Sequence, residues 1–458
     1  MELFFLLKKG NNFPSQLLQG IRKEFFDNDS LISEGEHYTL FVNKKTMASG
    51  CSHYSTDYGS VFGTGTFIYR MQDPDESLRL LLEDYICGRF DSAALLGHYY
   101  IILLVQSGIK ILTDATFLVK AYHDSEGSYL TSSFLLAARI HKRLTLNRAA
   151  VTENLLTGGL IGSETPVNEI NCLTKANFII FRDIDFVIPQ AVATESETES
   201  EAAAVRRQSA LLDTYFRSCS MLAGIKGADI GLTGGYDSRL VLAYAGKHFR
   251  DLQVHSHRRP TESEEWRIAH MIAESERIPF VSPAITPLTE MDDSMLQRVI
   301  NSSFLFNDGA ITLHCNWMEE YNTLEYRQRV LGENQFGING IGGEQYRNQD
   351  RIYGKPWLFS QWLKYYYMRR TSGSAVINER TEREIVQRIR DKICAILELP
   401  PGIKLISLFL LKRIQNEVLI PAYRGAKTDA ENRHSWHLSP FADYHLSRPA
   451  YSLAGFLK

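Results

Sequence analysis

One segment near the middle of the chain constrains the fold more than any other, because it predicts a strand, a glycine-rich turn and a helix in immediate succession. The apolar run Ala228–Leu232 is followed by Thr233–Ser238 (Thr-Gly-Gly-Tyr-Asp-Ser) and by the helical pattern of Ser238–Lys247. A second strand, Leu252–Ser256, and a second helix, Ser263–Glu276, come next. Strands that alternate with helices predict a parallel, doubly wound sheet.

Residues 1–192 have a different pattern, in which apolar or alternating runs separated by polar turns predict strands. Amphipathic helices are expected at Glu76–Ile86 and Phe134–His141. Many strands with few helices predict a two-sheet sandwich. The expected strands are Glu2–Leu7, Tyr38–Val42, Gly65–Tyr69, Tyr99–Val105, Ile109–Thr113, Tyr129–Thr131 and Phe178–Phe181.

An acidic stretch without aromatic residues, Thr194–Ala204, predicts an exposed linker that runs into a helix. A chain of 458 residues is long enough for two or three domains. We place the boundary at this stretch, between a domain of residues 1–192 and a second domain of residues 205–458. After residue 290 the pattern is mainly helical, as in Trp357–Arg369 and Glu382–Leu397.

The composition is that of a globular protein, with 44% hydrophobic and 22% charged residues. A net charge of -3 argues against a nucleic-acid partner, and no apolar run approaches the roughly 20 residues of a membrane span. The apolar N-terminus, Met1–Lys9, lacks the features of a signal peptide and predicts a first strand. Six cysteines without paired or zinc-type spacing indicate buried thiols and a cytoplasmic location: Cys51, Cys87, Cys172, Cys219, Cys315 and Cys394.

The chemistry of the glycine-rich turn follows from its residue types. Gly234 and Gly235 let a ligand approach the backbone closely and permit dihedral angles that other residues avoid. The N–H groups at a helix N-terminus favour an anion such as phosphate, and the hydroxyls of Thr233 and Ser238 add donors. Because Asp237 by itself repels phosphate, we expect it to hold Mg²⁺ between its carboxylate and the phosphates.

The same residues are compatible with a simple Gly-Gly turn in which Asp237 caps the helix. The preceding strand, the following helix and a position where the strand order reverses favour a nucleotide site over that alternative. The turn is not a Walker loop, because no Gly-Lys-Ser/Thr sequence follows it.

The turn resembles the Ser-Gly-Gly-x-Asp-Ser pyrophosphate loop of the ATP-pyrophosphatase superfamily, with Thr233 in place of the first serine. Within that superfamily the chain resembles the asparagine-synthetase-like amide ligases, which include asparagine synthetase, β-lactam synthetases and lasso-peptide cyclases. Asn339–Glu344 (Asn-Gly-Ile-Gly-Gly-Glu) lies where the family has Gly-x-Gly-Ser-Asp. The resemblance implies a nucleotide contact at Gly340 and, at Glu344, a second carboxylate for magnesium and pyrophosphate. Ser439–Asp443 resembles the family's Pro-Phe-x-Asp motif.

Residues 1–192 resemble the glutaminase-type sandwich of the same family. The rest of the chain resembles the family's ATP-pyrophosphatase domain with its helical C-terminal part. Leu95–Leu104 is similar to the central strand of the sandwich, and Asp114–Tyr122 with Tyr129–Ser133 to later motifs. Glutamine-using members place a cysteine directly after the initiator methionine, whereas this chain has Glu2 there. The resemblance therefore implies a degenerate domain that hydrolyses no glutamine.

Another departure lies between the glycines of the second motif. Family members often have Glu or Tyr there, near the reacting amine, but this chain has Ile341, which cannot carry a proton. Any base must come from elsewhere, with Glu344, Gln345 and Tyr346 close in sequence, or the amine must arrive neutral.

Related enzymes also continue into a tail whose lysine stabilises the charge that develops on phosphorus and on the oxyanion. We expect Lys427 or Arg424 to take this role, unless a longer tail supplies it; both are alternatively solvated surface charges.

Two pairs of histidines are considered as ligands. His255 and His257 follow the second strand of the parallel sheet, where the superfamily receives adenine, so the resemblance implies a nucleotide contact at His255 rather than a zinc site. His434 and His437 have helix-like spacing and no evident carboxylate or cysteine partner, so we expect both to serve packing.

These features predict an ATP- and Mg²⁺-dependent ligase that adenylates a small-molecule or peptide carboxylate and transfers it to an amine or to ammonia. Natural-product, peptide or surface-glycan biosynthesis is the expected setting. A lasso-type macrolactam cyclase and a non-catalytic, nucleotide-binding relative are the alternatives. We expect no nucleic-acid or membrane partner, and a homodimer is left open.

Overall fold

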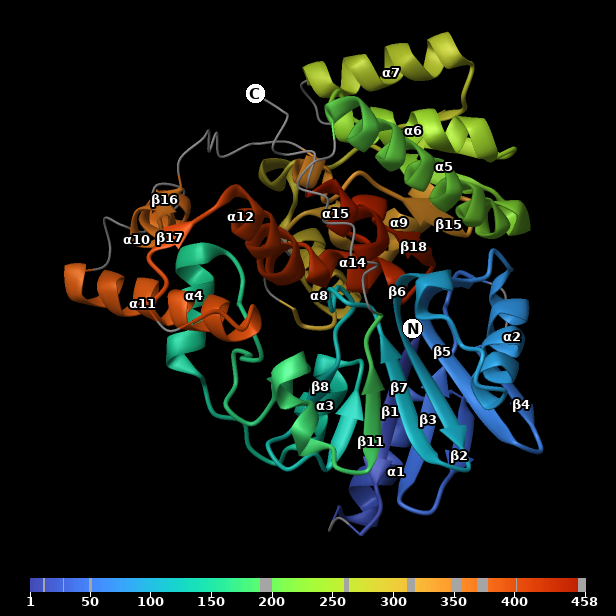
Figure 1. The fold of residues 1–458 in the computed structure, drawn as a ribbon, viewed down its shortest axis with the longest axis vertical. Helices are drawn as coiled ribbons and strands as arrows, with labels where there is room; N and C mark the ends of the chain where they lie inside the picture. Colours follow the sequence, from blue (N-terminus) through green and yellow to red (C-terminus); the bar gives the residue numbers. More distant parts are fainter. Residues whose placement is uncertain are drawn as a thin grey trace.

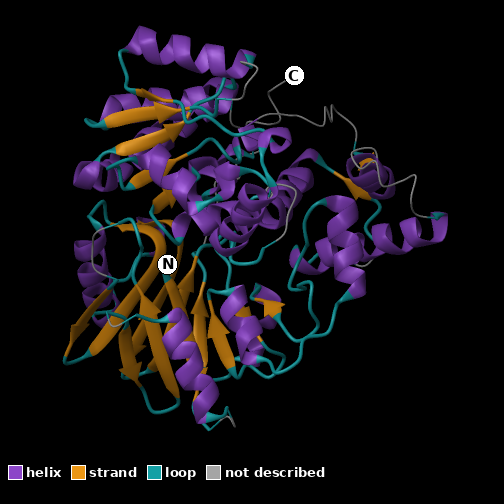
Figure 2. Cartoon of the chain, turned by 180° about the vertical axis from the view of Figure 1, so that it is seen from behind, coloured by secondary structure: helices purple, strands orange, loops and turns teal. Residues whose placement is uncertain are grey.

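The computed structural model describes residues 1–10, 13–27, 29–48, 52–189, 200–258, 263–310, 318–346, 356–368, 378–400 and 402–451. Its first half is rich in strands and its second half in helices, and the two halves lie directly against each other (Figure 1). Seen from behind, the long strands of the first half gather on one side, and the shorter strands of the second half lie beyond them among helices (Figure 2). The architecture is therefore mixed α/β, with largely antiparallel sheets followed by a parallel sheet.

The first half contains two sheets that pack face to face, as predicted. β1 (Leu3–Lys8) lies inside one sheet and β6 (Leu95–Val105) inside the other, and side chains of both, such as Phe4 and Ile102, share one buried cluster. Every pairing is antiparallel except that of β11 with β7. One sheet has the order β10-β8-β9-β1-β3-β2; its other strands are β10 (Asn171–Cys172), β8 (Tyr122–His123), β9 (Tyr129–Thr131), β3 (Tyr38–Asn43) and β2 (Leu31–Glu34). The second sheet has the order β11-β7-β6-β5-β4; its other strands are β11 (Ile184–Val187), β7 (Gly108–Thr113), β5 (Gly59–Tyr69) and β4 (His53–Thr56).

The second half is built on a five-stranded sheet in which every pairing is parallel, as predicted. β12 lies at its centre, with β13 and β14 on one side and β15 and β18 on the other, so the strand order reverses beside β12. Fully buried apolar residues such as Ile230 and Val254 suit strands that are covered on both faces. The strands are β12 (Ala228–Gly231), β13 (Leu252–His255), β14 (Phe280–Val281), β15 (Phe336–Ile338) and β18 (Trp436–Leu438).

Helices surround both parts. In the first half they are α1 (Ser15–Phe25), α2 (Pro74–Ile86), α3 (Phe134–Ile140) and α4 (Arg148–Thr157). In the second half they are α5 (Glu201–Lys226), α6 (Tyr236–His248), α7 (Glu264–Glu276), α8 (Asp293–Phe306), α9 (Leu324–Leu331), α10 (Phe359–Leu363), α11 (Glu379–Ile396), α12 (Leu408–Ile414), α13 (Ile420–Tyr423), α14 (Gly425–Asn432) and α15 (Tyr444–Ala450). Within the described ranges, no helix combines the length and the apolar character that crossing a bilayer requires.

Two predicted elements are wrong. The expected strand at Phe178–Phe181 lies mostly within a 3-10 helix, Lys175–Ile180, because Thr174 and Asn177 form reciprocal capping hydrogen bonds at its start. The expected single helix at Trp357–Arg369 begins as a short strand, β16 (Trp357–Leu358), which pairs with β17 (Leu405–Ile406). That segment then continues as α10 and as a wide helical turn to Met368, and Arg369 lies outside the described residues.

The cysteines that the structure describes follow the prediction of buried thiols only in part. Cys219 is fully buried in α5, and Cys172 and Cys394 are half-buried. Cys87 is exposed, because it caps the C-terminal end of α2, where the chain turns away from the core. Cys51 and Cys315 lie outside the described residues.

The two halves differ in architecture but share one hydrophobic core. A single buried cluster contains Ile101 of β6 together with Phe216 of α5 and Ile338 of β15. Charged contacts add to it, since the fully buried Glu153 of α4 pairs with Lys392 of α11 at 2.6 Å. Of the predicted linker, residues 194–199 lie outside the described residues, and α5 begins at Glu201.

Two glycines lie close together on the paired strands β5 and β6, with Gly65 opposite Tyr99 and Gly97 opposite Phe67. Gly65 has a φ of +86° and Gly97 a φ of +115°. A Cβ atom would lie 2.2 Å from the His98 carbonyl oxygen at the first position and 2.1 Å from the Thr66 carbonyl oxygen at the second. Only glycine fits both the dihedral angle and the space.

Replacing Gly65 by alanine is expected to lower the free energy of unfolding by about 3 kcal/mol or more, because a positive φ and a backbone collision add together. Gly10→Ala is the matched control, since Gly10 has a φ of +84° and no atom lies within 4 Å of the place that its Cβ would take, so only the dihedral cost of about 1 kcal/mol applies. Urea denaturation of both variants measures the difference, and equal losses would contradict the collision.

Candidate functional site

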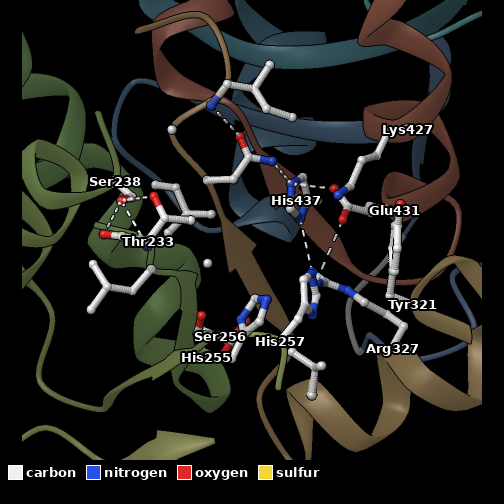
Figure 3. A pocket seen from close by; sticks show the side chains of 18 of the residues that line it. Thr233, Ser238, His255, Ser256, His257, Tyr321, Arg327, Lys427, Glu431 and His437 are labelled. Atoms are coloured by element: carbon white, nitrogen blue, oxygen red, sulfur yellow. Dashed lines mark hydrogen bonds and ion pairs between the residues drawn. The ribbon is translucent and has the colours of Figure 1, made fainter. Parts of the chain in front are cut away.

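A cavity of about 350 Å³ opens at the carboxyl ends of the parallel strands, beside the point where the strand order reverses. Ligands of open α/β sheets bind at such points. Figure 3 shows the loop after β12 on one side of the cavity and side chains from α9 and α14 on the opposite side. Ten of the eleven predicted site residues line it: Leu232, Thr233, Gly235, Asp237, Ser238, His255, Gly340, Glu344, Arg424 and Lys427.

The loop after β12 leads directly into α6. Gly235 is the N-cap of this helix and no side chain caps it. Asp237 is therefore the second residue of α6, and the alternative in which Asp237 caps the helix is wrong. The first N–H groups of α6 have no acceptor within the helix, and Gly235 and Asp237 place them at the cavity, which suits an anionic ligand.

The hydroxyls predicted to meet phosphate are engaged inside the loop. The Thr233 and Ser238 hydroxyl oxygens lie 3.0 Å apart, and the Thr233 N–H donates to Ser238 Oγ at 3.0 Å. The Gly235 N–H donates to Thr233 Oγ1 at 3.2 Å. These bonds hold the loop in its shape, so both residues serve the site first by fixing its backbone.

The two glycines of the loop have different surroundings. Neither has a positive φ, so the unusual dihedral angles expected for them are not found. Gly234 is the one predicted residue that does not line the cavity. A Cβ on Gly234 would lie 3.0 Å from Ile268 Cδ1 and 3.5 Å from Glu265 Cα, so this glycine allows α7 to pack against the loop.

The second motif lies directly against the first. A Cβ on Gly340 would lie 2.9 Å from the Ser238 nitrogen, and one on Gly343 would lie 2.2 Å from Asp237 Cγ. Glu344, the next residue, lines the same cavity as Asp237. The structure therefore brings together the two carboxylates that the sequence predicts as magnesium ligands.

A divalent metal at this place would take only part of its ligands from the protein. Among the described residues, no three His, Cys, Asp or Glu side chains gather closely enough to hold a metal ion. Mg²⁺ is commonly held by one or two carboxylates, with phosphate oxygens and water completing its shell. Asp237 and Glu344 fit that arrangement when a nucleotide supplies the remaining oxygens.

The third motif, Ser439–Asp443, packs against the second motif, Asn339–Glu344. A Cβ on Gly342, which has a φ of +93°, would lie 2.8 Å from the backbone of Phe441 and of Ala442. Asp443 accepts a hydrogen bond from the Gly97 N–H at 2.8 Å and pairs with His445 at 3.0 Å. Burial raises the pKa of Asp443, but His445 outweighs burial, and the pKa lies below its usual value.

The wall opposite the loop is a buried charged cluster that the sequence did not indicate. Arg327 of α9 donates from Nη2 to His437 Nδ1 at 3.1 Å, and Glu431 of α14 lies 2.8 Å from His437 Nε2. Arg327 Nη1 is 3.9 Å from Glu431, and Asn339 Nδ2 is 2.7 Å from His437 Nε2. Figure 3 shows His437 between the Arg327 and Glu431 side chains.

The charges of this wall are set by its burial and its cations. Burial alone raises the pKa of Glu431, but the contact with His437 and the charges of Arg327 and Lys427 overcome it and hold that pKa well below its usual range. Burial lowers the pKa of His437 more than Glu431 raises it. Glu431 is therefore a carboxylate and His437 a neutral imidazole at pH 7, so the wall with Arg327 and Lys427 carries net positive charge.

Lys427 and Arg424, the residues expected to stabilise the reacting groups, both line the cavity. Lys427 Nζ lies 5.8 Å from the centroid of the Tyr321 ring, and the ammonium acts on Glu431 as well. The alternative in which both are ordinary surface charges does not account for that placement.

The two histidines after β13 are held by neighbours. His255 Nδ1 lies 2.7 Å from Asp229, a buried carboxylate in β12. His257 hydrogen-bonds the Tyr326 hydroxyl at 2.6 Å and stacks on Tyr321, with ring centroids 5.3 Å apart. Both line the cavity, where flat rings suit an aromatic base.

The packing role predicted for His437 is wrong, while that for His434 is confirmed. His437 belongs to strand β18 rather than to a helix, and its carboxylate partner Glu431 comes from α14. His434 stacks on Phe306 with ring centroids 5.1 Å apart, and burial lowers its pKa to about 3. The sequence signal that could have indicated this wall is the i, i+4 spacing of Lys427 and Glu431, which places both side chains on one face of a helix.

Glu2 is buried where the resemblance expects a catalytic cysteine. Its carboxylate pairs with Lys45 at 2.8 Å and accepts a hydrogen bond from the Gly65 N–H at 2.7 Å. The cavity beside it has a volume of about 20 Å³, enough for about one water molecule. No cysteine lines this cavity among the described residues, and its volume leaves no room for glutamine.

Comparisons with known proteins add no relative: no protein-family model matches the chain, and no curated protein matches it significantly. The likeness to amide ligases therefore stays a prediction that depends on the motifs and on the cavity that contains them.

Replacing Glu431 by glutamine is expected to lower the free energy of unfolding by about 3–5 kcal/mol at pH 7, because Arg327 then lacks its buried counter-charge. The folded-state pKa of Glu431 is depressed, so its contribution is present above the unfolded-state pKa of about 4.3 and is lost as the pH falls below that value. Urea denaturation at pH 7 and pH 3.5 should show a smaller difference between wild type and variant at pH 3.5. A difference that grows on acidification would contradict the assignment.

Proposed function

We propose that the protein is an ATP- and Mg²⁺-dependent ligase that adenylates a carboxylic acid and transfers the acyl group to an amine or to ammonia. The observation that carries this proposal is the meeting of Asp237 and Glu344 in one cavity, with Lys427 and Arg424 lining the same space. The architecture supports it, since a largely antiparallel sandwich followed by a parallel sheet fits a degenerate glutaminase-like domain and an ATP-pyrophosphatase domain.

The nucleotide is assigned to the loop side of the cavity. The N-terminus of α6 meets the phosphates, and the rings of His255 and His257 lie at the end of β13, where the base would stack. Asp237 and Glu344 are the residues that would hold Mg²⁺. When bound, Mg²⁺ would offset the negative charge of the triphosphate.

The acid is assigned to the opposite wall, where Arg327, Lys427 and Arg424 supply positive charge. A carboxylate oxygen attacks the α-phosphorus of ATP, the new oxygen–phosphorus bond forms, and the bond to the bridging oxygen of pyrophosphate breaks. Lys427 is the cation that would stabilise the negative charge that increases on the α-phosphate oxygens in this step.

In the second step the nitrogen of an amine attacks the acyl carbon and AMP leaves with its electron pair. The amine must lose a proton, and Ile341 cannot accept it. Glu431 is a weak base, because its pKa is held far below the usual range. A neutral amine is therefore the expected nucleophile, and the proton that its nitrogen loses as the amide forms passes to the departing AMP phosphate or to water. Rates should rise with pH as the free ammonium form of the nucleophile loses its proton.

The first half supplies no ammonia in this proposal. Glu2 is tied to Lys45 and Gly65 in a space for about one water molecule. The nitrogen is therefore expected to reach the cavity from solvent, as a free amine or as ammonia.

Asp237→Asn is expected to reduce pyrophosphate release from ATP by about 100-fold or more, because the variant loses one of two metal-binding carboxylates. Release is measured by a coupled pyrophosphate assay over a panel of carboxylic acids with an amine present. Asp251→Asn is the matched control, an exposed residue at the opposite end of the same sheet, and it should retain full activity. No release by the unaltered protein with any acid, together with ATP binding by calorimetry, would favour the nucleotide-binding alternative.

Lys427→Met is expected to lower kcat by about 100-fold with little change in the KM for ATP, because the lost charge acts on the transition state. Arg424→Met tests the other candidate in the same assay. If neither variant loses more than threefold, the stabilising cation lies elsewhere.

A further inference from the structure

The wall that contains His437 is attached to the first half of the molecule through one hydroxyl group. The His437 backbone N–H donates to Thr66 Oγ1 at 2.8 Å, and that hydroxyl donates to Asn432 Oδ1 at 2.5 Å. Thr66 belongs to β5 and is fully buried. One side chain thus contacts both β18, which contains His437, and the end of α14, which contains Lys427 and Glu431.

This contact exists because β18 is the last strand of the parallel sheet. The outward N–H groups of an edge strand need acceptors when they are buried. The first half supplies acceptors along this segment, with Thr66 for His437 and His98 for Ser439 at 3.3 Å. Beyond them the direction reverses, and the Gly97 N–H of the first half donates to Asp443. The positive-φ glycines at positions 65 and 97 flank this stretch, so the strained part of the β5–β6 ladder is the part that meets β18.

A buried ion pair secures the same corner from the other side. Lys45 Nζ pairs with Glu2 at 2.8 Å and also donates to the carbonyl oxygen of Asn432. Asn432 is the last residue of α14. A continuous series of polar contacts therefore runs from Glu2 through Lys45, Asn432 and Thr66 to the backbone N–H of His437, whose ring contacts Arg327 and Glu431.

We propose that the first half of the chain works as a positioning support for the acid-binding wall, with Thr66 as the positioning residue and the Glu2–Lys45 pair as its anchor. The assignment of this wall as the binding site of the acid rests on the proposed function. Thr66 touches neither nucleotide nor acid; it fixes the backbone of His437, and His437 in turn orients Arg327 and Glu431 at the cavity.

Three variants separate positioning from mere packing. Thr66→Val keeps the shape of the side chain but removes both hydrogen bonds, and Thr66→Ser keeps the hydroxyl. Thr64→Val is the matched control, because Thr64 lies in the same strand, is buried, and donates to the Tyr100 carbonyl oxygen within the first half at 3.3 Å.

The first measurement is independent of turnover. Nitrogen-15 NMR of the His437 ring, assigned with His437→Gln, reports its protonation between pH 7.5 and 5.5. The groups facing the ring are Arg327, Glu431, Lys427 and Asn339. We expect the ring to take up its proton at a higher pH in Thr66→Val than in the unaltered protein, Thr66→Ser and Thr64→Val, because a displaced ring loses part of the burial and of the Arg327 contact that lower its pKa. An unchanged ring in Thr66→Val would overturn the proposal.

The second measurement uses the acid that supports pyrophosphate release. Thr66→Val should raise the KM for that acid about tenfold, leave the KM for ATP within twofold, and be restored by Thr66→Ser; Thr64→Val should match the unaltered protein. Equal changes in the KM for the acid in Thr66→Val and Thr64→Val would show that the effect comes from packing alone, and would overturn the positioning role of Thr66. If the unaltered protein releases no pyrophosphate, the ligase proposal fails, while the NMR result still decides whether Thr66 positions His437.

Discussion

The cavity depends on the absence of side chains where two loops cross. β12 and β15 are parallel neighbours, so the loops that follow them leave the same edge of the sheet side by side. Gly340 and Gly343 let the loop after β15 lie directly on the loop after β12. A Cβ on Gly343 would lie 2.2 Å from Asp237 Cγ. Any larger residue would separate the loops, and Asp237 and Glu344 would no longer face one ligand.

The opposite wall depends on electrostatics rather than on close approach. A buried guanidinium, a buried carboxylate and a neutral imidazole contact one another, and either charge would be costly to bury alone. Such a cluster keeps its geometry only if the backbone beneath it is fixed. The helices that contribute Arg327 and Glu431 are short, and the strand of His437 is an edge strand, so support from the first half matters at this wall more than at the loop.

The sequence predicts the parts of this structure that are local. The junction at Thr233–Ser238 and the strands β1, β3, β5, β6, β7, β9, β12 and β13 follow from apolar periodicity and turn residues, whereas short strands such as β2, β4 and β14 were not predicted. Local pattern fails where a distant partner decides. His437 gains its role from Arg327, more than one hundred positions away, and Trp357 forms a strand only because β17 lies beside it. The loop side of the cavity was predicted because one continuous segment forms most of it, and the opposite wall was missed because three separated elements form it.

The buried pair at positions 2 and 45 also restricts how this protein can change. Glu2 and Lys45 lie beside a space that holds about one water molecule. A neutral residue at either position would therefore leave the remaining charge buried without a counter-ion. Single substitutions at these two sites should therefore be rejected, whereas paired replacement by apolar residues of matching size could be accepted. In evolutionary terms the two positions are expected to covary, and a change to a thiol at position 2 alone would give an unstable intermediate sequence.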